Sequence, residues 1–212
     1  MNARVVIVDD HKLFHIGFRE LLAGSSIEVV GGFESGQAAD QWLTRHSADL
    51  LMMDVRLQAP DGLDWIEIFQ KRYNLPTVVM SGFDNPVYMA RAYALGARDY
   101  LIKNGEVDRI VDVIERAIDG RPPRDDSPMG RVAAVLNREL QSQDMPAGFP
   151  LTGREAQVLR HLAYGLRNRE IAKSLSLSIE TIKEHVQNVI RKIEAADRTD
   201  AAVRAIKAGL VE

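Results

Sequence analysis

The chain of 212 residues contains no cysteine, which excludes disulfides and thiolate metal sites and allows a reducing compartment. It also lacks long apolar runs, since none approaches the roughly 20 residues of a membrane-spanning helix. Its first residues, MNARVVIVDD, have no apolar core of the kind found in signal peptides. We therefore expect a cytoplasmic protein with no membrane partner.

A large excess of one sign of charge is missing too, because the net charge of the whole chain is −3. The charge is nevertheless unevenly spread. Residues 151–212 hold 11 Lys+Arg against 8 Asp+Glu, a net of +3, whereas residues 1–150 hold 16 against 22, a net of −6. An acidic front and a mildly basic back suggest two parts with different partners.

Short apolar runs alternate with helical periodicity over the first 120 residues. Strands are expected at residues 4–8, 27–33, 49–54, 75–81 and 99–103. Helices are expected at residues 11–22, 35–45, 61–73, 85–95 and 107–118. This alternation predicts an α/β doubly wound fold, in which a five-stranded parallel sheet is covered by helices on both faces. A dinucleotide site is not predicted, because no Gly-x-Gly-x-x-Gly follows the first strand.

Reactive side chains stand where these strands end. Asp9 and Asp10 follow the first strand, Asp54 ends the apolar run DLLMMD, and Ser81 and Lys103 end two later strands. Three carboxylates that meet at one sheet edge repel one another and attract a cation. Mg²⁺ is the expected ion, because no cluster of His or Cys accompanies the acids. A cation, an ammonium group and a hydroxyl are the groups that stabilise the oxygens of a phosphoryl group. Asp54 is the candidate nucleophile, because a carboxylate can carry phosphate as an acyl phosphate.

The motifs VDDH and MMD resemble those of the receiver domain of two-component response regulators, a flavodoxin-like fold, and the resemblance covers residues 1 to about 120. It implies that Asp9 and Asp10 bind Mg²⁺ and that Asp54 is the phospho-acceptor. It also implies that the backbone carbonyl of Arg56 is a ligand to the metal. A dehalogenase-like phosphatase is not favoured, because that family needs an acid where Arg56 stands.

The same resemblance assigns roles to three further residues. Ser81 matches the Ser/Thr switch position, Lys103 the family's lysine, and Tyr100 the aromatic residue that turns inward when phosphate binds. One departure is visible, since Gln58 stands where the family usually has proline and Pro60 follows two residues later. This departure motivates an alternative, in which the receiver no longer signals through phosphate.

The remainder of the chain is predicted to be a linker and a helical domain. Residues 121–149 are rich in Pro, Gly and charge, with a helix expected at 131–141 and a loop at 142–150. From residue 150 to the end, the pattern predicts a compact all-α domain. Thr152 and Glu155 form a capping box for its first helix, and Ser178 is a natural cap for the third. The later helices are expected at residues 168–175, 179–194 and 200–208.

Two of these helices, joined by a short turn, suggest a helix-turn-helix, although the pattern alone equally fits an amphipathic helix with a solvated side. The segment LTGREAQVLRHLAYGLRNREIAKSLSLSIETIKEHVQNVIRKI closely resembles the LuxR-type DNA-binding domain. The resemblance implies dimerisation through the last helix. Arg167 departs from the family's usual serine cap, and Asn168 is expected to cap the helix instead, or the helix to start differently. The implied contacts are Lys183, Glu184 and Gln187 with base edges, and Thr181, Arg169 and Arg191 with phosphates.

The sequence thus predicts three segments: a receiver at residues 1–120, a linker at 121–149 and a LuxR-type domain at 150–212. We expect a transcriptional response regulator that is phosphorylated on Asp54 by a sensor histidine kinase and is not a turnover enzyme. An active homodimer would bind an inverted repeat in double-stranded DNA. The alternative is a phosphorylation-independent DNA-binding regulator whose receiver serves only for dimerisation or partner binding.

Overall fold

The computed structural model describes residues 2–57, 62–103, 107–138 and 149–211. The chain divides into two compact units, which are described separately below. The first comprises residues 1–85 with 95–130, and the second residues 86–94 with 131–212. No helix among the described residues is long and apolar enough to cross a bilayer.

A five-stranded parallel sheet forms the centre of the first unit. Its strands are β1 (Ala3–Val8), β2 (Ile27–Phe33), β3 (Leu50–Asp54), β4 (Thr77–Ser81) and β5 (Asp99–Ile102). They lie in the order β2-β1-β3-β4-β5, and every neighbouring pair is parallel. The chain therefore starts near the middle, moves to one edge and then returns past its start to the other edge. This order confirms the predicted doubly wound fold.

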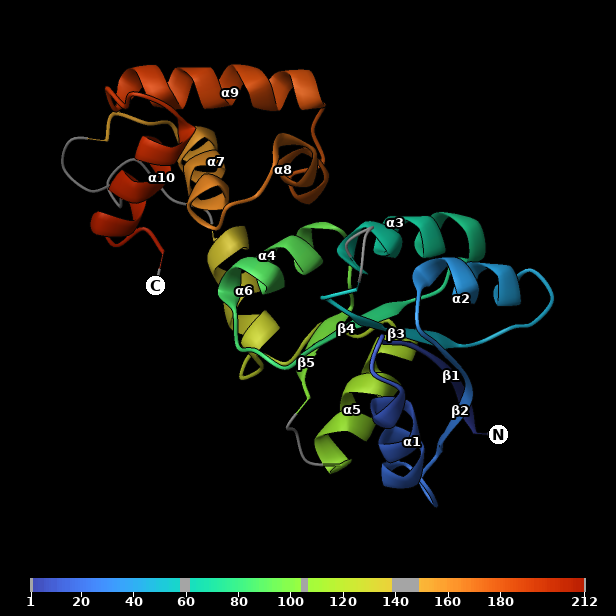
Figure 1. Ribbon diagram of the computed structural model, residues 1–212. Helices are drawn as coiled ribbons and strands as arrows, with labels where there is room; N and C mark the ends of the chain where they lie inside the picture. The colour runs from blue at the N-terminus through green and yellow to red at the C-terminus, as the bar shows by residue number, and fades with distance from the viewer. Residues whose placement is uncertain (1, 58–61, 104–106, 139–148, 212) are drawn as a thin grey trace. The chain divides into compact units, whose positions relative to one another are not determined.

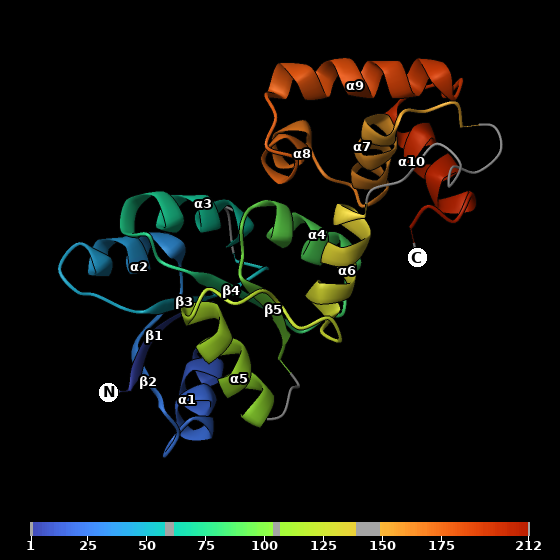
Figure 2. The same cartoon turned by 180° about the vertical axis from the view of Figure 1, so that it is seen from behind.

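Helices cover both faces of this sheet. Figures 1 and 2 show α1 and α5 on one face and α2 and α3 on the other. Their bounds are α1 Lys12–Leu21, α2 Gly36–Leu43, α3 Gly62–Tyr73 and α5 Val107–Ile118. The strands predicted at 75–81 and 99–103 are slightly shorter in the structure, as is expected where the ladder ends.

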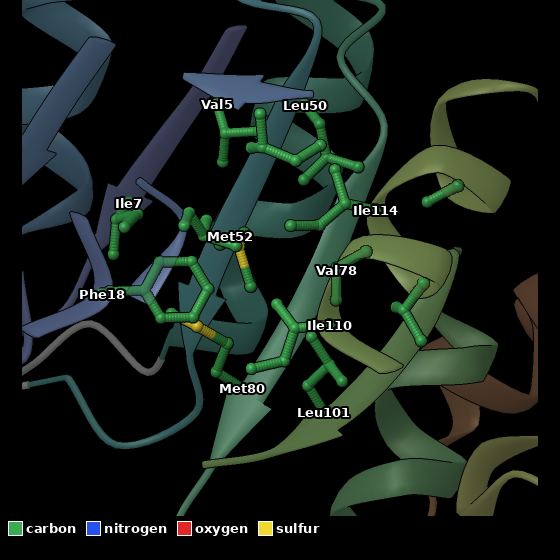
Figure 3. Packing of buried hydrophobic residues seen from close by; sticks show 14 residues of the cluster. Val5, Ile7, Phe18, Leu50, Met52, Val78, Met80, Leu101, Ile110 and Ile114 are labelled. Atoms are coloured by element: carbon green, nitrogen blue, oxygen red, sulfur yellow. The ribbon is translucent and has the colours of Figure 1, made fainter. Parts of the chain in front are cut away.

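Side chains of β1 and β3 point alternately to the two helical layers. Val5, Ile7 and Met52 belong to the core beneath α1 and α5, which Figure 3 shows. Val6 and Val8 belong to the core beneath α2 and α3. Because both faces are buried, β3 has no polar alternation, and its continuous apolar run correctly predicted a central strand.

The start of α3 lies directly against the end of β3. A Cβ atom added to Gly62 would lie 2.0 Å from the backbone oxygen of Asp54 and 3.2 Å from that of Val55. Only glycine permits so close an approach of helix and strand. The Asp54 carboxylate is thus carried by a backbone that is tightly enclosed on this side.

The second unit is helical. Its helices are α4 (Pro86–Ala94), α7 (Gly153–Ala163), α8 (Asn168–Ser174), α9 (Ile179–Lys192) and α10 (Arg198–Lys207), and α6 (Pro128–Asn137) enters it from the first unit. Leu159, Val189 and Ala201 are fully buried in a core shared by α7, α9 and α10. Within this unit Arg91 Nε of α4 lies 2.9 Å from Glu170 Oε1 of α8, and both side chains are buried.

The caps of the second unit agree largely with the sequence. Glu155 N donates to Thr152 Oγ1 at 3.3 Å and Thr152 N donates to Glu155 Oε2 at 2.8 Å, which confirms the capping box. Ser178 Oγ accepts from the backbone N–H of residue 181 at 3.0 Å and caps α9. Helix α8 begins at Asn168, so Asn168 is not its cap. The N–H of Arg167 instead donates to Glu170 Oε2 at 2.7 Å.

Two helices start earlier than predicted because an upstream side chain caps them. Helix α6 starts at Pro128, where Ser127 Oγ accepts from Gly130 N at 2.9 Å. Helix α10 starts at Arg198, since Asp197 Oδ1 accepts from two backbone N–H groups at 2.8 Å. The expected loop at 142–150 and the far end of the linker helix lie largely outside the described residues.

Candidate phosphoryl-acceptor site and nucleic-acid interface

Neighbouring parallel strands bring the first acids together. Val8 of β1 pairs with Met53 of β3, so Asp9 and Asp54 follow them at the same sheet edge. Asp9 is fully buried and Asp54 is 4% exposed. Two carboxylates so far removed from water require a cation or shared hydrogen bonds, as the sequence predicted.

Lys103 supplies the positive charge within the described part of this site. It follows β5, and its backbone N–H donates to Ser81 O at 2.8 Å, which fixes its position beside β4. Its Nζ lies 2.5 Å from Asp9 Oδ2 and 2.7 Å from Asp54 Oδ1. Burial lowers the pKa of Lys103, but its bonds to Asp54 and Asp9 outweigh burial and raise the pKa above the ordinary value. The ammonium is therefore charged at neutral pH.

Asp54 is held from two sides. Its Oδ1 faces Lys103, and its Oδ2 accepts the backbone N–H of Arg56 at 2.8 Å. Burial raises the pKa of Asp54, and the bonds to Lys103 offset only part of that rise. The Arg56 guanidinium lies 4.5 Å from the centre of the Phe83 ring. Gln58 and Pro60, the departure noted in the sequence, lie outside the described residues.

Asp10 and His11 extend the acidic cluster toward solvent. Asp10 Oδ1 is buried and accepts no well-aligned hydrogen bond among the described residues, and the imidazole of His11 lies beside it. His11 Nδ1 lies 2.8 Å from Asp10 Oδ1 and 3.1 Å from Asp9 Oδ1. One imidazole therefore stands beside the acids, and the sequence analysis did not single it out as a possible ligand. His11 directly follows Asp10, and this adjacency was the signal that the sequence offered.

These donor atoms suit a hard divalent cation. The ligand atoms of Asp9, Asp10 and His11 all lie within 4.8 Å of one another, and carboxylate oxygens are the ligands that Mg²⁺ prefers. Asp54 lies at the same edge and shares Lys103 with Asp9. The predicted magnesium residues are thus brought together, apart from the Arg56 carbonyl, whose role stays a prediction.

Ser81 and Tyr100 are both linked to Phe83, which follows β4. Ser81 is 3% exposed and its Oγ accepts from Phe83 N at 3.1 Å. Tyr100 is 2% exposed and its hydroxyl donates to Phe83 O at 3.2 Å. The tyrosine ring therefore already has the inward position that the sequence associated with the phosphorylated state. The hydroxyl of Ser81 reaches the same edge as Asp54, because β3 and β4 are paired neighbours.

A largely apolar cavity of about 650 Å³ opens beside these groups. Asp54, Ser81 and Lys103 contribute to its wall, and the rings of Phe14 and Phe18 from α1 form its apolar side. The Asp54 carboxylate therefore has an approach from outside the sheet, although the residue itself is buried.

The surface of α9 separates into a buried and an exposed side. Ile182, Val186 and Val189 are buried in the second unit. Polar side chains occupy the other side, as expected of a helix that reads a DNA groove. Lys183, Glu184, Gln187 and Arg191 are exposed, Thr181 is half-buried, and Arg169 of α8 is exposed. The six predicted DNA contacts thus all reach the surface of one unit.

Contacts away from this surface hold α9 in place. Lys192 Nζ lies 2.7 Å from Glu155 Oε2, so the capping residue of α7 also binds the end of α9. Burial raises the pKa of Glu155, but the bonds to Lys192 and Thr152 outweigh it and lower the pKa below the ordinary value. Helix α10 exposes Val203 and Ile206, at 41% and 52%. These apolar side chains lie on the helix where the sequence predicted dimerisation.

Comparisons with known proteins divide the chain in the same way. The response regulator receiver domain model matches residues 5–115, and the model of bacterial regulatory proteins of the luxR family matches residues 150–205. The transcriptional regulatory protein LiaR of Bacillus subtilis (strain 168) is 32% identical over 98% of this chain and 99% of its own. DegU of Brevibacillus brevis is 29% identical over 99% of this chain and 95% of its own.

Solved structures share the fold. The RcsB response regulator of Salmonella typhimurium has a TM-score of 0.58 at 23% identity, covering 97% of this chain and 98% of that one. An RcsB–DNA complex has a TM-score of 0.56 at 23% identity, covering 99% and 100%. At this identity the similarity supports the architecture alone.

Proposed function

Because this chain belongs to the two-component response regulators with a LuxR-type DNA-binding domain, we propose that its DNA binding is controlled by phosphorylation of Asp54. The donor would be the phosphohistidine of a sensor histidine kinase. A carboxylate oxygen of Asp54 forms a bond to phosphorus while the phosphorus–nitrogen bond of the donor breaks, and the leaving imidazole takes up a proton. The product is an acyl phosphate on the end of β3.

One observation carries this proposal: the contact of Lys103 Nζ with Asp54 Oδ1 at 2.7 Å inside a buried acidic edge. An ammonium at this distance stabilises the charge that gathers on phosphoryl oxygens during transfer. Ser81 contributes a hydroxyl from the neighbouring strand end. Asp9, Asp10 and Asp54 would hold Mg²⁺, which supplies charge neutralisation when bound.

After transfer, the added negative charge acts on groups that are already linked. Lys103 and Ser81 would turn toward the phosphoryl oxygens, and Ser81 would then release the backbone N–H of Phe83 that it now accepts. Phe83 also accepts the Tyr100 hydroxyl, so a shift of this loop moves β5 as well. Such a shift changes the relative populations of two conformations of the receiver surface. We propose that this surface controls dimerisation and hence binding to an inverted repeat.

Asp54→Asn is the decisive variant. Wild-type protein is expected to incorporate label from a small radioactive phosphodonor only with Mg²⁺, and the variant is expected to incorporate none. Asp49→Asn is the matched control, because Asp49 precedes the opposite end of β3 and accepts the backbone N–H of Arg4 at 2.7 Å. Labelling that survives in Asp54→Asn would place the acceptor elsewhere.

DNA binding is tested by fluorescence anisotropy at stated salt, with and without the phosphodonor. Lys183→Ala is expected to weaken binding to the operator about tenfold or more if Lys183 reads a base edge. Lys207→Ala, on α10, is the control cation. Equal affinities for both variants and wild type would show that this side of α9 does not face DNA.

A second candidate is a DNA-binding regulator whose receiver works without phosphate. The observation in its favour is that Lys103 already pairs with both Asp9 and Asp54, so the acidic edge has an internal counter-charge. This candidate predicts operator affinity and oligomeric mass that do not respond to the phosphodonor. The labelling and anisotropy experiments together therefore separate the two functions.

A further inference from the structure

His11 stands at the N-cap position of α1 with its ring turned back over the acidic edge. Its backbone N–H donates to Asp9 Oδ1 at 2.9 Å, which fixes the turn between β1 and α1. The side chain is 73% exposed, so the ring is oriented by its polar contacts and not by burial. Its Nδ1 is hydrogen-bonded to Asp9 Oδ1 and also points at Asp10.

The distances match those between atoms that share one metal ion. Two ligands at adjacent corners of an octahedron, each about 2.1 Å from the cation, lie about 3 Å apart. His11 Nδ1 is 2.8 Å from Asp10 Oδ1 and 3.1 Å from Asp9 Oδ1. Each oxygen therefore lies as far from the nitrogen as two ligands of one cation would, and the ligand atoms of the three residues all lie within 4.8 Å of one another.

Neighbouring polar side chains bind other atoms of Asp9 and leave the two Oδ1 atoms facing His11. Lys103 binds Asp9 through Oδ2, so Oδ1 is left to face His11. Asp10 Oδ1 is buried and accepts no well-aligned hydrogen bond within the described residues, although His11 Nδ1 lies 2.8 Å from it. His15, one turn further along α1, donates from Nε2 to Asp9 O at 2.8 Å and supports the backbone of the acid pair.

We propose that His11 Nδ1 is a third protein ligand to the cation held by Asp9 and Asp10. The consequence is a site of mixed nitrogen and oxygen donors, which favours later first-row transition cations such as Ni²⁺ relative to an all-oxygen site. Mg²⁺ gains little from an imidazole, because it prefers oxygen and retains its waters. The inference deepens the proposed function, since it rests on the same cation site, and it concerns metal selectivity.

The experiment is isothermal titration calorimetry of tag-free full-length protein with Mg²⁺ and with Ni²⁺. His11→Gln is expected to weaken Ni²⁺ binding about tenfold or more and to leave Mg²⁺ binding within about twofold. His46→Gln is the matched control, because this exposed imidazole follows the end of α2, where it stacks on Trp42 and bonds to Trp42 O at 3.0 Å. Its metal affinities should equal those of wild type.

Pulsed electron paramagnetic resonance of bound Mn²⁺ gives an independent readout. Coupling to a coordinated imidazole nitrogen is expected in wild type and in His46→Gln, and absent in His11→Gln. Coupling and Ni²⁺ affinity that are unchanged in His11→Gln would overturn the inference. Asp10→Asn separates the His11 inference from the proposed function. If Asp10→Asn loses Mg²⁺ binding while His11→Gln binds both metals like wild type, the cation site of the acids stands and only the role of the imidazole fails. If Asp10→Asn too binds Mg²⁺ like wild type, the cation site of the proposed function fails as well.

Discussion

Lys103 Nζ lies 2.7 Å from Asp54 Oδ1 and, at the same time, 2.5 Å from Asp9 Oδ2. One ammonium thus bridges two carboxylates that belong to neighbouring strands and are both almost fully buried. The free energy of folding depends on this bridge, because two buried carboxylates without a counter-charge repel each other and lose hydration. The same ammonium that would assist phosphoryl transfer therefore also stabilises the sheet edge.

Lys103→Met should lower the free energy of unfolding of the first unit by about 3 kcal/mol at pH 7, the size typical of breaking a buried ion pair. The variant removes the positive charge and leaves both acids in place. Urea unfolding followed by tryptophan fluorescence measures this directly. Both tryptophans, Trp42 and Trp65, lie in the first unit, so the signal reports that unit alone.

Added Mg²⁺ provides the internal check on this prediction. If the loss arises from uncompensated carboxylates, the cation should raise the urea midpoint of Lys103→Met more than that of wild type. Lys103→Arg keeps the charge and should lose less stability. An unfolding midpoint of Lys103→Met equal to that of wild type would mean that the ammonium is merely solvated there.

The sequence predicted the strand ends well, because parallel strands bring their carboxyl ends to one edge whatever the side-chain details. Asp9, Asp54, Ser81 and Lys103 meet for this reason. The sequence did not predict which oxygen of each acid faces Lys103, because that depends on side-chain rotamers. Nor did it predict the position of His11, whose ring orientation follows from the turn that starts α1.

The burial of some side chains could not be predicted from the sequence. Met129 lies upstream of the helix predicted within the linker, yet it is fully buried on α6. Arg160 occupies a helical position where an arginine is normally exposed, and it is 2% exposed. Each case requires a tertiary partner that periodicity along one segment does not reveal.

Gly62→Ala should destabilise the first unit by about 3 kcal/mol, at the upper end of overpacking costs, because the new Cβ would lie 2.0 Å from Asp54 O. The clash is with backbone, which has no rotamer to change. Urea unfolding by tryptophan fluorescence again gives the measurement. The shift of α3 should also reduce labelling of Asp54 by a phosphodonor.

Gly17→Ala is the control for this prediction. Gly17 lies inside α1, and an added Cβ would meet nothing within 4 Å. Alanine there should raise the free energy of unfolding by about 0.5–1 kcal/mol, through helix propensity alone. A Gly62→Ala protein as stable as wild type would show that α3 shifts away from β3 at negligible cost.

His161 should make the second unit less stable in mild acid. Burial lowers its pKa to about 4, and the ring bonds Gln157 O at 2.7 Å and Ser174 Oγ at 2.9 Å in its neutral form. The unfolded chain binds a proton below the ordinary pKa of about 6.5, whereas the folded chain does not until about pH 4. This contribution is therefore fully present above pH 6.5 and is lost as the pH falls toward 4, by about 3 kcal/mol in all.

Hydrogen exchange of the α7 amides, corrected for intrinsic rates, measures this loss between pH 7 and pH 5. His161→Gln removes the titrating group and should flatten the dependence, although it lowers stability at pH 7. His185→Gln, on α9 of the same unit, should retain the wild-type slope. Identical slopes in wild type and His161→Gln would assign the acid sensitivity to other groups.

Arg160 of α7 is hydrogen-bonded to the C-terminal end of α6, and Arg160→Met should destabilise that end of the helix. Its guanidinium donates to Val135 O at 2.7 Å and to Arg138 O, two carbonyls at the C-terminal end of α6. Methionine fills similar space but leaves these carbonyls without their donors, at a cost of about 1–3 kcal/mol. Faster hydrogen exchange is expected in the last turn of α6, with α9 unchanged.

Arg154→Met is the control, because it also removes an arginine from α7. It tests whether the faster exchange in α6 depends on Arg160 in particular. Arg154 is exposed on the same helix and bonds Gln157 Oε1 at 2.9 Å, so its removal should leave α6 protected. Arg160→Lys provides a charge without the planar fork and should restore only part of the protection. If Arg160→Met exchanged like wild type in α6, the two carbonyl bonds would contribute nothing to the helix end, and α6 would be held by its apolar contacts alone.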